Sequence, residues 1–414
     1  MRAGAKATSV RNQHVPVGIV AALGLTQIIG YGTLYYSFSI LAPRMAADLG
    51  ITLAQVFAVF SASLFVGGLS APYIGRQMDR IGAAAVMATG SALSAMTLIL
   101  CAWSPSVAIF ALAVVLLEIS SGMVQYQAAF AALVEADPRS ASRSITYLTL
   151  IAGFASTIFW PVATAMLGYL TWREIYLVYA GLNLTVSMPL HLWIMQRGKV
   201  AAAGGQRPTR EPVAGVIPHE RRRSTVFAVS AAFALLGFTL GAMLAHMVPM
   251  LSTLGFGDAA VVIGSLFGPA QVLSRLINMI FGTRLAPPGL AVVSAIFMVL
   301  SVVILALSGN WLPGAVAFAI CLGLGSGINS IAQGSLPLYL FGSEGYGALT
   351  GKMAAARLAA GAAAPFAFAA TMEQVGIVAS LVLSAALGSI AIAGFVAVAM
   401  ATKRTVVATP SPSN

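Results

Sequence analysis

Charged residues are scarce in this chain of 414 residues, since Asp, Glu, Lys and Arg together make up 8% of it. Soluble globular proteins contain about 25% charged residues, which interact with the surrounding water. A chain with 59% apolar residues and so little charge cannot cover a water-exposed surface. The composition therefore excludes a soluble enzyme, a disordered chain and a nucleic-acid-binding domain. It indicates an integral membrane protein that contacts the lipid bilayer.

Cysteine is also rare. The two cysteines, Cys101 and Cys321, both lie in apolar stretches, so a disulfide framework is not expected. The sequence contains no Gly-rich lysine loop for ATP phosphates, no Cys/His spacing for a metal and no Ser-His-Asp cluster for hydrolysis. We therefore expect no cofactor, no metal and no enzymatic activity.

Long apolar runs are what the sequence has in abundance. A bilayer core about 30 Å thick is crossed by roughly 20 apolar residues of helix. The short alternating segments of an outer-membrane barrel do not occur. The sequence predicts an all-α membrane protein, because helices satisfy their own backbone hydrogen bonds in lipid. Twelve transmembrane helices are predicted, over residues 16–41, 52–75, 83–103, 106–134, 144–170, 174–195, 225–254, 258–282, 289–308, 312–341, 345–372 and 374–401.

The basic residues indicate how these helices are oriented. Cytoplasmic segments of membrane proteins carry an excess of Lys and Arg. With the N-terminus in the cytoplasm, most of the 22 basic residues fall on that side, including Arg221, Arg222 and Arg223. An even number of helices places both termini in the cytoplasm. We expect a multi-pass protein of the cell inner membrane, whose net charge of +11 reflects its topology and requires no nucleic acid partner.

One long polar segment divides the chain. Residues 196–224 are rich in Gly, Pro and Arg, which is typical of a flexible linker. We expect an N-terminal six-helix bundle over residues 1–195, a cytoplasmic linker over 196–224, a C-terminal six-helix bundle over 225–402 and a cytoplasmic tail over 403–414.

Short motifs recur at corresponding positions of the two halves. Gly75 at the end of the second run and Gly282 at the end of the eighth are half the chain length apart. Gly50 after the first run and Gly255 after the seventh have nearly the same separation. Internal repeats of this kind are common in secondary transporters.

The loop after the second run carries a further motif. It has Gly75 and Arg76, then Asp79 and Arg80, and then Gly82. Together with two sets of six helices, this motif resembles the signature of the major facilitator superfamily. We expect the glycines to let helices end and turn tightly, and the aspartate to lie near a helix N-terminus. The resemblance implies the major facilitator fold, transport by alternating access, and a gating role for these five residues.

A closer resemblance is to the oxalate/formate and monocarboxylate transporter branch of that superfamily. It rests on the segment 30–36, on Arg275 in the eighth helix and on a cation in the eleventh helix after Tyr346. In that branch the two cations bind the substrate carboxylate. The resemblance therefore implies this role for Arg275 and for Lys352 or Arg357. The glycine- and proline-rich stretch of drug exporters is missing from the fifth helix.

Four charged residues, Glu118, Arg275, Lys352 and Arg357, lie inside the predicted helices away from the helix ends. A charge in the middle of a bilayer costs roughly 2.5–3.5 kcal/mol, so such residues usually line a water-filled path. Arg275 can hold a carboxylate with two hydrogen bonds, or it can form a structural ion pair. Glu118 can carry a coupled proton, or it can pair with a buried arginine. Lys352 and Arg357 are five residues apart and face different directions.

The balance of these charges predicts the charge of the substrate, and other polar side chains are candidates for binding it. Three cations against one acid favour an anionic substrate. The resemblance places the first, fourth, seventh and tenth helices around the cavity, which favours Tyr35, His246, Asn329 and Gln333 as substrate-binding residues. His246 can also relay a proton. Each of the four can instead make a hydrogen bond between packed helices. Further polar and aromatic candidates are Tyr31, Tyr36, Gln125, Tyr126, Gln127, Tyr147, Trp160 and Asn278.

These observations predict a secondary transporter that works by alternating access. The predicted cargo is a small organic anion, monocarboxylate-like, bound by Arg275 with a cation of the eleventh helix. It moves in symport with a proton carried by Glu118 or His246. Two alternatives remain open: a proton-driven efflux pump for hydrophobic compounds, and a transceptor that binds without transport. The expected partners are the lipid bilayer, the small-molecule substrate and protons, and we expect a monomer.

Overall fold

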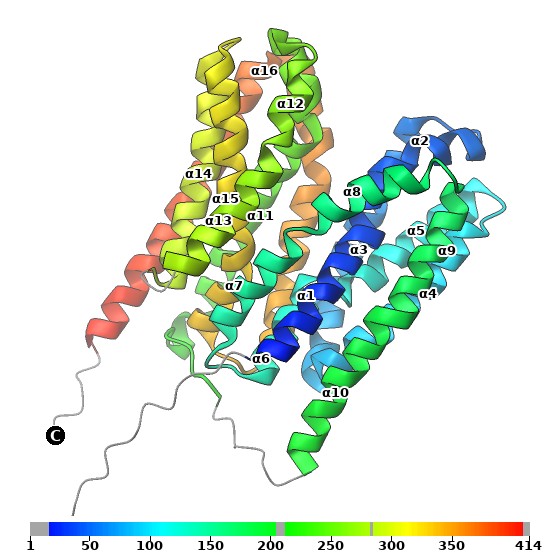
Figure 1. The fold of residues 1–414 in the computed structure, drawn as a ribbon. Coiled ribbons are helices and arrows are strands. Elements are labelled where there is room, and N and C mark those ends of the chain that lie inside the picture. The colour runs from blue at the N-terminus through cyan, green and yellow to red at the C-terminus, as the bar shows by residue number, and fades with distance from the viewer. Residues whose placement is uncertain (1–15, 204–211, 282–284, 409–414) are drawn as a thin grey trace, which may run out of the picture.

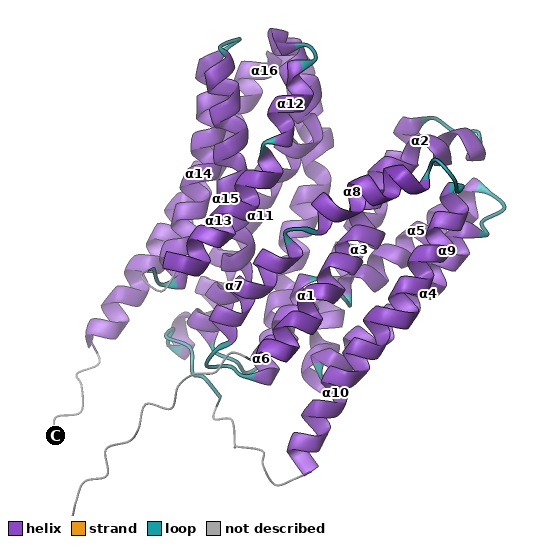
Figure 2. Ribbon diagram, viewed as in Figure 1, coloured by secondary structure: helices purple, strands orange, loops and turns teal. Residues whose placement is uncertain are grey.

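The described part of the chain is almost entirely helical. The structure, a computed structural model, describes residues 16–203, 212–281 and 285–408. Within these residues the backbone forms α-helices, three short π-helical segments and one isolated β-bridge between Ala214 and Gly342, but no strand (Figure 2). The predicted all-α membrane fold is therefore confirmed.

Six stretches of the first half are long and apolar enough to cross a membrane. Several of them are interrupted by a π-helical segment or by a break of a few residues, which is why the helices outnumber the spans. The elements are α1 (Val17–Tyr31), η1 (Gly32–Tyr36), α2 (Ser37–Leu49), α3 (Leu53–Ile81), α4 (Ala83–Ala102), α5 (Val107–Gly122), α6 (Tyr126–Ala136), α7 (Ala141–Ala152), α8 (Ala155–Met166), α9 (Trp172–Leu182), η2 (Asn183–Ser187) and α10 (Met188–Ala203).

Five such stretches lie in the described second half. The last one, Tyr346–Lys403, has 58 residues, so at 1.5 Å per residue it would be about 87 Å long, nearly three bilayer cores. It turns at Gly376, where φ is 83°, and therefore contains the last two predicted spans (Figure 1). The elements are α11 (His219–Leu251), η3 (Ser252–Phe256), α12 (Ala259–Ser265), α13 (Phe267–Phe281), α14 (Pro287–Ser308), α15 (Leu312–Phe341) and α16 (Tyr346–Ala408).

Helix α3 is longer than the sequence predicted. It begins at a capping box in which the Thr52 hydroxyl and the Gln55 side chain each satisfy a free backbone N–H. It continues to Ile81, so the prediction that this helix ends at Gly75 is wrong. Gly82 makes the predicted tight turn, since its φ of 92° is open to glycine and lets α4 begin at the next residue.

The two halves meet at one end of the molecule, which we call the closed end. The start of α1 and the last turn of α16 both lie at this end, where α3 packs against α16 (Figure 1). A Cβ at Gly75 would collide with the carbonyl of Gly347, so the glycine allows the two backbones to touch. At the far end, α2 and the turn of α16 lie well apart (Figure 1). The site described next lies where these two inclined halves face each other.

Candidate functional site

A group of tyrosines from the first half forms one side of the site. Tyr35 and Tyr36 belong to the π-helical segment η1, in which the wider turn lets the Ser37 hydroxyl donate to the Gly32 carbonyl at 2.7 Å. Such single π turns inside α-helices often occur at functional sites. The rings of Tyr35 and Tyr36 are 5.3 Å apart, and Tyr31 lies 6.1 Å from Tyr36.

The tyrosine group is completed by two residues from other helices. Tyr126 begins α6 after a three-residue break in the fourth span, and its ring is 4.8 Å from that of Tyr31. Trp160 of α8 lies edge-on to Tyr36 at 6.2 Å. We call Tyr31, Tyr35, Tyr36 and Tyr126 the tyrosine cluster. Tyr35 exposes 38% of its surface although it stands in the interior of a span.

Arg275 reaches this cluster from the second half. It stands on α13, is 3% exposed, and its Nε donates to the Ser330 hydroxyl of α15 at 3.2 Å. Its Nη1 has no hydrogen-bond partner among the described residues. A Cβ at Gly153 would lie 2.6 Å from Nη1, so this glycine leaves room for the guanidinium between the halves. The positive charge of Arg275 acts on the phenols of Tyr36 and Tyr126.

Arg357 approaches the same cluster from α16. Its backbone and side-chain stem pack against Gly237 of α11, where a Cβ would lie 2.8 Å from the Arg357 Cγ. Its charge acts on Tyr31 and Tyr35, and its side chain is half-buried. Lys352, five residues earlier on the same helix, is exposed. The structure therefore brings Arg357, and not Lys352, to the tyrosine cluster.

Glu118 lies on the other side of α3. It is 7% exposed, and a Cβ at Gly67 of α3 would be 3.2 Å from the Glu118 Cβ. Its Oε1 has no hydrogen-bond partner among the described residues. Tyr35 is within electrostatic reach of both Glu118 and Arg357. No ion pair joins Glu118 to an arginine in the described part of the chain, so the carboxyl group and the two guanidinium groups stay separate in this conformation.

The other residues predicted to bind substrate do not all lie at the tyrosine cluster. His246 lies nine residues beyond Gly237 on α11, about 13 Å along the helix axis. Its Nε2 donates to the Pro365 carbonyl at 2.9 Å, and its ring packs 5.4 Å from that of Phe368. It therefore links α11 to α16 away from the tyrosine cluster.

Asn329 and Gln333 share helix α15. Asn329 directly precedes Ser330, the hydroxyl partner of Arg275, and it is 1% exposed with an Oδ1 that has no partner among the described residues. Gln333 is half-buried one turn further on. Ser330 and Gly153 could not be singled out from the sequence, because serine and glycine are common in transmembrane helices.

The predicted gating loop joins the two halves at the closed end. Asp79 Oδ1 accepts from the Gly347 N–H at 2.8 Å, and Oδ2 accepts from the Ala348 N–H at 2.7 Å. The carboxylate thus caps the first turn of α16, where a negative charge is favoured. Arg76 lies 6.0 Å from the ring of Tyr73, and Arg80 is exposed. The corresponding second-half residues, Gly282 to Arg284, lie outside the described residues.

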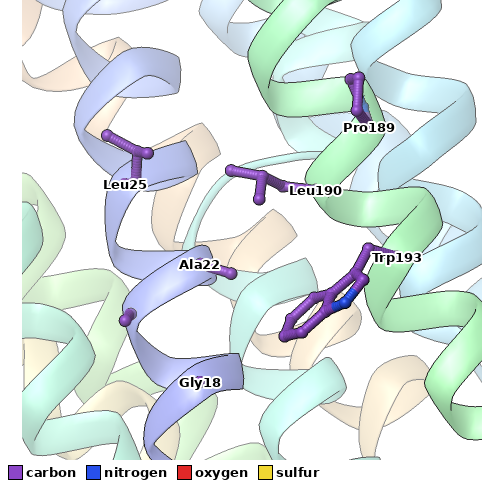
Figure 3. Close-up of a pocket in the computed structure, with 7 residues that line it drawn as sticks. Gly18, Ala22, Leu25, Pro189, Leu190 and Trp193 are labelled. Atoms are coloured by element: carbon purple, nitrogen blue, oxygen red, sulfur yellow. The ribbon is translucent and has the colours of Figure 1, made fainter.

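A separate pocket lies elsewhere in the first half. It has a volume of about 470 Å³ and lies between α1 and α10 (Figure 3). Gly18, Ala22 and Leu25 line one side, and Leu190 and Trp193 line the other. These walls are apolar, and none of the predicted charged residues reaches them. The tyrosine cluster with its two arginines is therefore the better candidate for a polar substrate site.

Comparison with known proteins identifies the fold family. A family model described as Major Facilitator Superfamily matches residues 23–365. The chain belongs to the Major Facilitator Superfamily. The resemblance noted in the sequence is therefore confirmed at the level of the superfamily.

Individual relatives of this superfamily member are distant. The multidrug resistance protein MdtL of Escherichia coli O157:H7 is 30% identical over 176 residues, which are 41% of this chain and 43% of that protein. The chain thus spans less than half of the length of the curated relatives it matches. The human organic anion transporter MFSD10 has a similar structure, with a TM-score of 0.69 and 15% identity over 92% of this chain and 99% of that one. The transporter FucP in the outward conformation also has a similar structure. Its TM-score is 0.67 and its sequence identity is 14%, over 91% of this chain and 97% of that one.

Proposed function

We propose that this transporter moves a small organic anion, monocarboxylate-like, across the inner membrane by alternating access, in symport with a proton. The observation that carries the proposal is the position of two cations. Arg275 and Arg357 of the second half both act on the tyrosine cluster of the first half. A bound anion between them would join the two halves, which is what a substrate must do to control their movement.

The charge at this position supports an anion in particular. A buried charge without a partner is costly, and Arg275 has an Nη1 with no partner among the described residues. A carboxylate can accept two parallel hydrogen bonds from a guanidinium group. The phenol groups of the cluster can donate further hydrogen bonds to the same ligand. Asn329 and Gln333 on α15 are proposed as additional polar contacts; Lys352 and His246 are less favoured as such contacts.

The proposed proton carrier is Glu118. It is a buried carboxyl group without an ion pair among the described residues, and Tyr35 lies within electrostatic reach of it. Because Tyr35 is also within reach of Arg357, we propose that an anion bound near Arg357 acts on Glu118 through the Tyr35 hydroxyl. We propose His246 as a structural link between helices, because its Nε2 is already bonded to the Pro365 carbonyl.

The conformation supports the alternating-access part of the proposal. Asp79 closes one end by capping α16, whereas the halves lie apart at the far end. With the basic segments in the cytoplasm, the closed end is cytoplasmic and this conformation faces outward. Gly75, Arg76, Asp79, Arg80 and Gly82 act as the gate, and we propose a monomer with both termini in the cytoplasm.

Counterflow in proteoliposomes tests the substrate class. Vesicles are loaded with unlabelled oxalate, lactate or benzoate, and exchange of the labelled anion is followed. The wild type should exchange at least one of these anions. Arg275→Ala removes a bidentate contact of about 3 kcal/mol, so the affinity should fall roughly 150-fold. Arg223→Ala, an exposed arginine on α11, serves as the control and should behave as the wild type.

The alternatives give different results in the same vesicles. An efflux pump for hydrophobic compounds is favoured by the similarity to MdtL and by the aromatic rings beside Tyr36. It would exchange ethidium and none of the anions, and Arg275→Ala would have no effect. A transceptor would bind an anion without flux. Either result would refute anion transport, and unchanged proton-driven accumulation in Glu118→Gln would refute the proposed coupling.

A further inference from the structure

A set of buried polar groups lies inside the first half, away from the tyrosine cluster. His191 of α10 is 1% exposed, and its Nδ1 is 2.9 Å from the Ser91 hydroxyl of α4. Its Nε2 has no hydrogen-bond partner among the described residues. The hydroxyl groups of Ser121 and Ser187, each nearly fully buried, also have no such partner. Buried polar groups are normally satisfied, so this accumulation requires an explanation.

The groups follow one another in space. On α4, Ser91 and Ser94 are three residues apart and share a face; on α5, Glu118 and Ser121 do the same. The Ser94 hydroxyl donates to that of Ser120 at 3.1 Å, so Ser120 marks the side of α5 that meets α4. Ser121 lies about 100° around α5 from Ser120 and about 60° from Glu118, and is therefore between the two. A path from Glu118 reaches the serines of α4 by way of Ser121 and then leads from Ser91 to His191.

The line also has a direction. Helix α4 begins at the closed end. Ser94 of α4 contacts Ser120 of α5, and a Cβ at Gly90 of α4 would lie 2.6 Å from the Met123 Cβ. Because lower residue numbers on α4 pair with higher residue numbers after Ser120, the two helices are antiparallel. Moving from Ser94 to Ser91, and from Glu118 to Ser121, both lead toward the closed end. Helix α10 also extends toward this end beyond His191 (Figure 1).

We propose that this line is a proton pathway between Glu118 and the closed end, with His191 as its relay. The inference rests on the proposed role of Glu118 as the proton carrier. Water molecules fit the unpartnered groups, because a buried water bridges about three polar atoms that otherwise lack partners. The pathway passes through the interior of the first half, so a proton can leave Glu118 while Asp79 keeps the closed end shut to the anion.

The proton transfer balances at each step. The imidazole takes a proton on one ring nitrogen and releases another from the second, as only histidine among the side chains does near neutral pH. Each hydroxyl or water forms one O–H bond as it loses another. One proton moves in net terms, between the Glu118 carboxyl and water at the closed end, and no other reactant is needed.

The surroundings of His191 contain few competing charges. Helices α1 and α4, which pack against α10, carry no Asp, Glu, Lys, Arg or His. On α10 itself the nearest charged residues are Arg197 and Lys199, at least six positions away. The groups that face the ring are the Ser91 hydroxyl and the Met87 carbonyl, both on α4.

Infrared measurement of hydrogen–deuterium exchange at the Glu118 carboxyl group tests the pathway without a substrate. The full chain is placed in lipid nanodiscs, and Glu118→Gln identifies the carboxyl band by its loss. We expect His191→Leu to slow exchange about a hundredfold, the contribution typical of a positioned proton-transfer group. Thr97→Val is the control, because the Thr97 hydroxyl bonds carbonyls of its own helix, and it should exchange as the wild type does.

A purely structural role for His191 predicts something else. His191→Gln keeps an amide that can hydrogen-bond Ser91 but cannot pass a proton from one nitrogen to the other. Slow exchange in this variant supports the relay, and exchange at the wild-type rate overturns it. If His191→Leu does not fold, Ser91→Ala provides the same comparison. Fast exchange in all variants refutes the proton pathway, even if Glu118→Gln abolishes proton-driven accumulation. Conversely, proton-driven accumulation that persists in Glu118→Gln refutes only the coupling role of Glu118.

Discussion

The Asp79 carboxylate should stabilise the conformation in which the closed end is shut. The substitution Asp79→Asn is expected to weaken this stabilisation. The native side chain accepts two hydrogen bonds from the first turn of α16, at 2.8 Å and 2.7 Å. Asparagine has one acceptor oxygen, and its NH₂ group would face an N–H. The variant therefore loses one hydrogen bond and also the interaction of a negative charge with the helix N-terminus.

The size of the effect follows from these two losses. The hydrogen bond contributes about 1 kcal/mol in net terms, and the charge at the helix end contributes about 0.3–1 kcal/mol. The two together lower the stability of the closed end by roughly 1–2 kcal/mol. Since 1.4 kcal/mol corresponds to a factor of ten, the ratio of this conformation to the opposite one should fall about 5- to 30-fold.

Distances between spin labels on the two halves measure this ratio. Cys101 and Cys321 are replaced by serine, and labels are attached at Arg197 of α10 and Arg223 of α11, both exposed and near the closed end. Asp79→Asn should add a population with a longer distance.

The matched control is Asp137→Asn. The Asp137 carboxylate bonds Ser140 at 2.6 Å within a single half, so its loss should leave the distances unchanged. A distance distribution in Asp79→Asn identical to that of the wild type would refute the capping argument.

Three further outcomes are expected. Arg275→Lys keeps the charge but loses the fork of donors, so a counterflow titration should show about tenfold weaker anion binding; equal affinity would argue against a bidentate contact. Gly75→Ala places a methyl group against the Gly347 carbonyl and should lower the melting temperature in detergent by a few degrees, whereas no change would mean that the backbones separate without cost. Tyr35→Phe removes the hydroxyl that lies within electrostatic reach of both Arg357 and Glu118, so proton-driven uptake should slow while exchange persists; equal loss of both would contradict a coupling role.

Much of the fold could be predicted from the sequence because the bilayer imposes simple requirements. Length and hydropathy alone predicted the spans, including two within α16, whose turn at Gly376 lies two residues after the predicted start of the run 374–401. The prediction was wrong where one residue type serves two purposes. Gly82 turns the chain, but Gly75 lies inside a helix and allows close packing.

The candidate site was predictable only in part. Arg275, Arg357 and Glu118 could be predicted as site residues because a charged side chain inside the bilayer costs free energy and usually has a functional role. The choice between Lys352 and Arg357 depended on where α16 packs, which Gly237 and Gly75 determine from other helices. Likewise, His191 has no motif around it, because its only distinguishing feature is that its neighbours in space are serines.

The bond between Asp79 and Gly347 also has a consequence for biosynthesis, because its two ends are 268 residues apart in the chain. A ribosome adds about 5–20 residues per second, so Asp79 waits roughly 13–54 s in the membrane before its partner exists. During that interval the Asp79 carboxylate has no helix end to cap, although α13 and α15 can already pack against α7. The closed end of a newly made chain therefore lacks this contact for tens of seconds, until α16 has been synthesised.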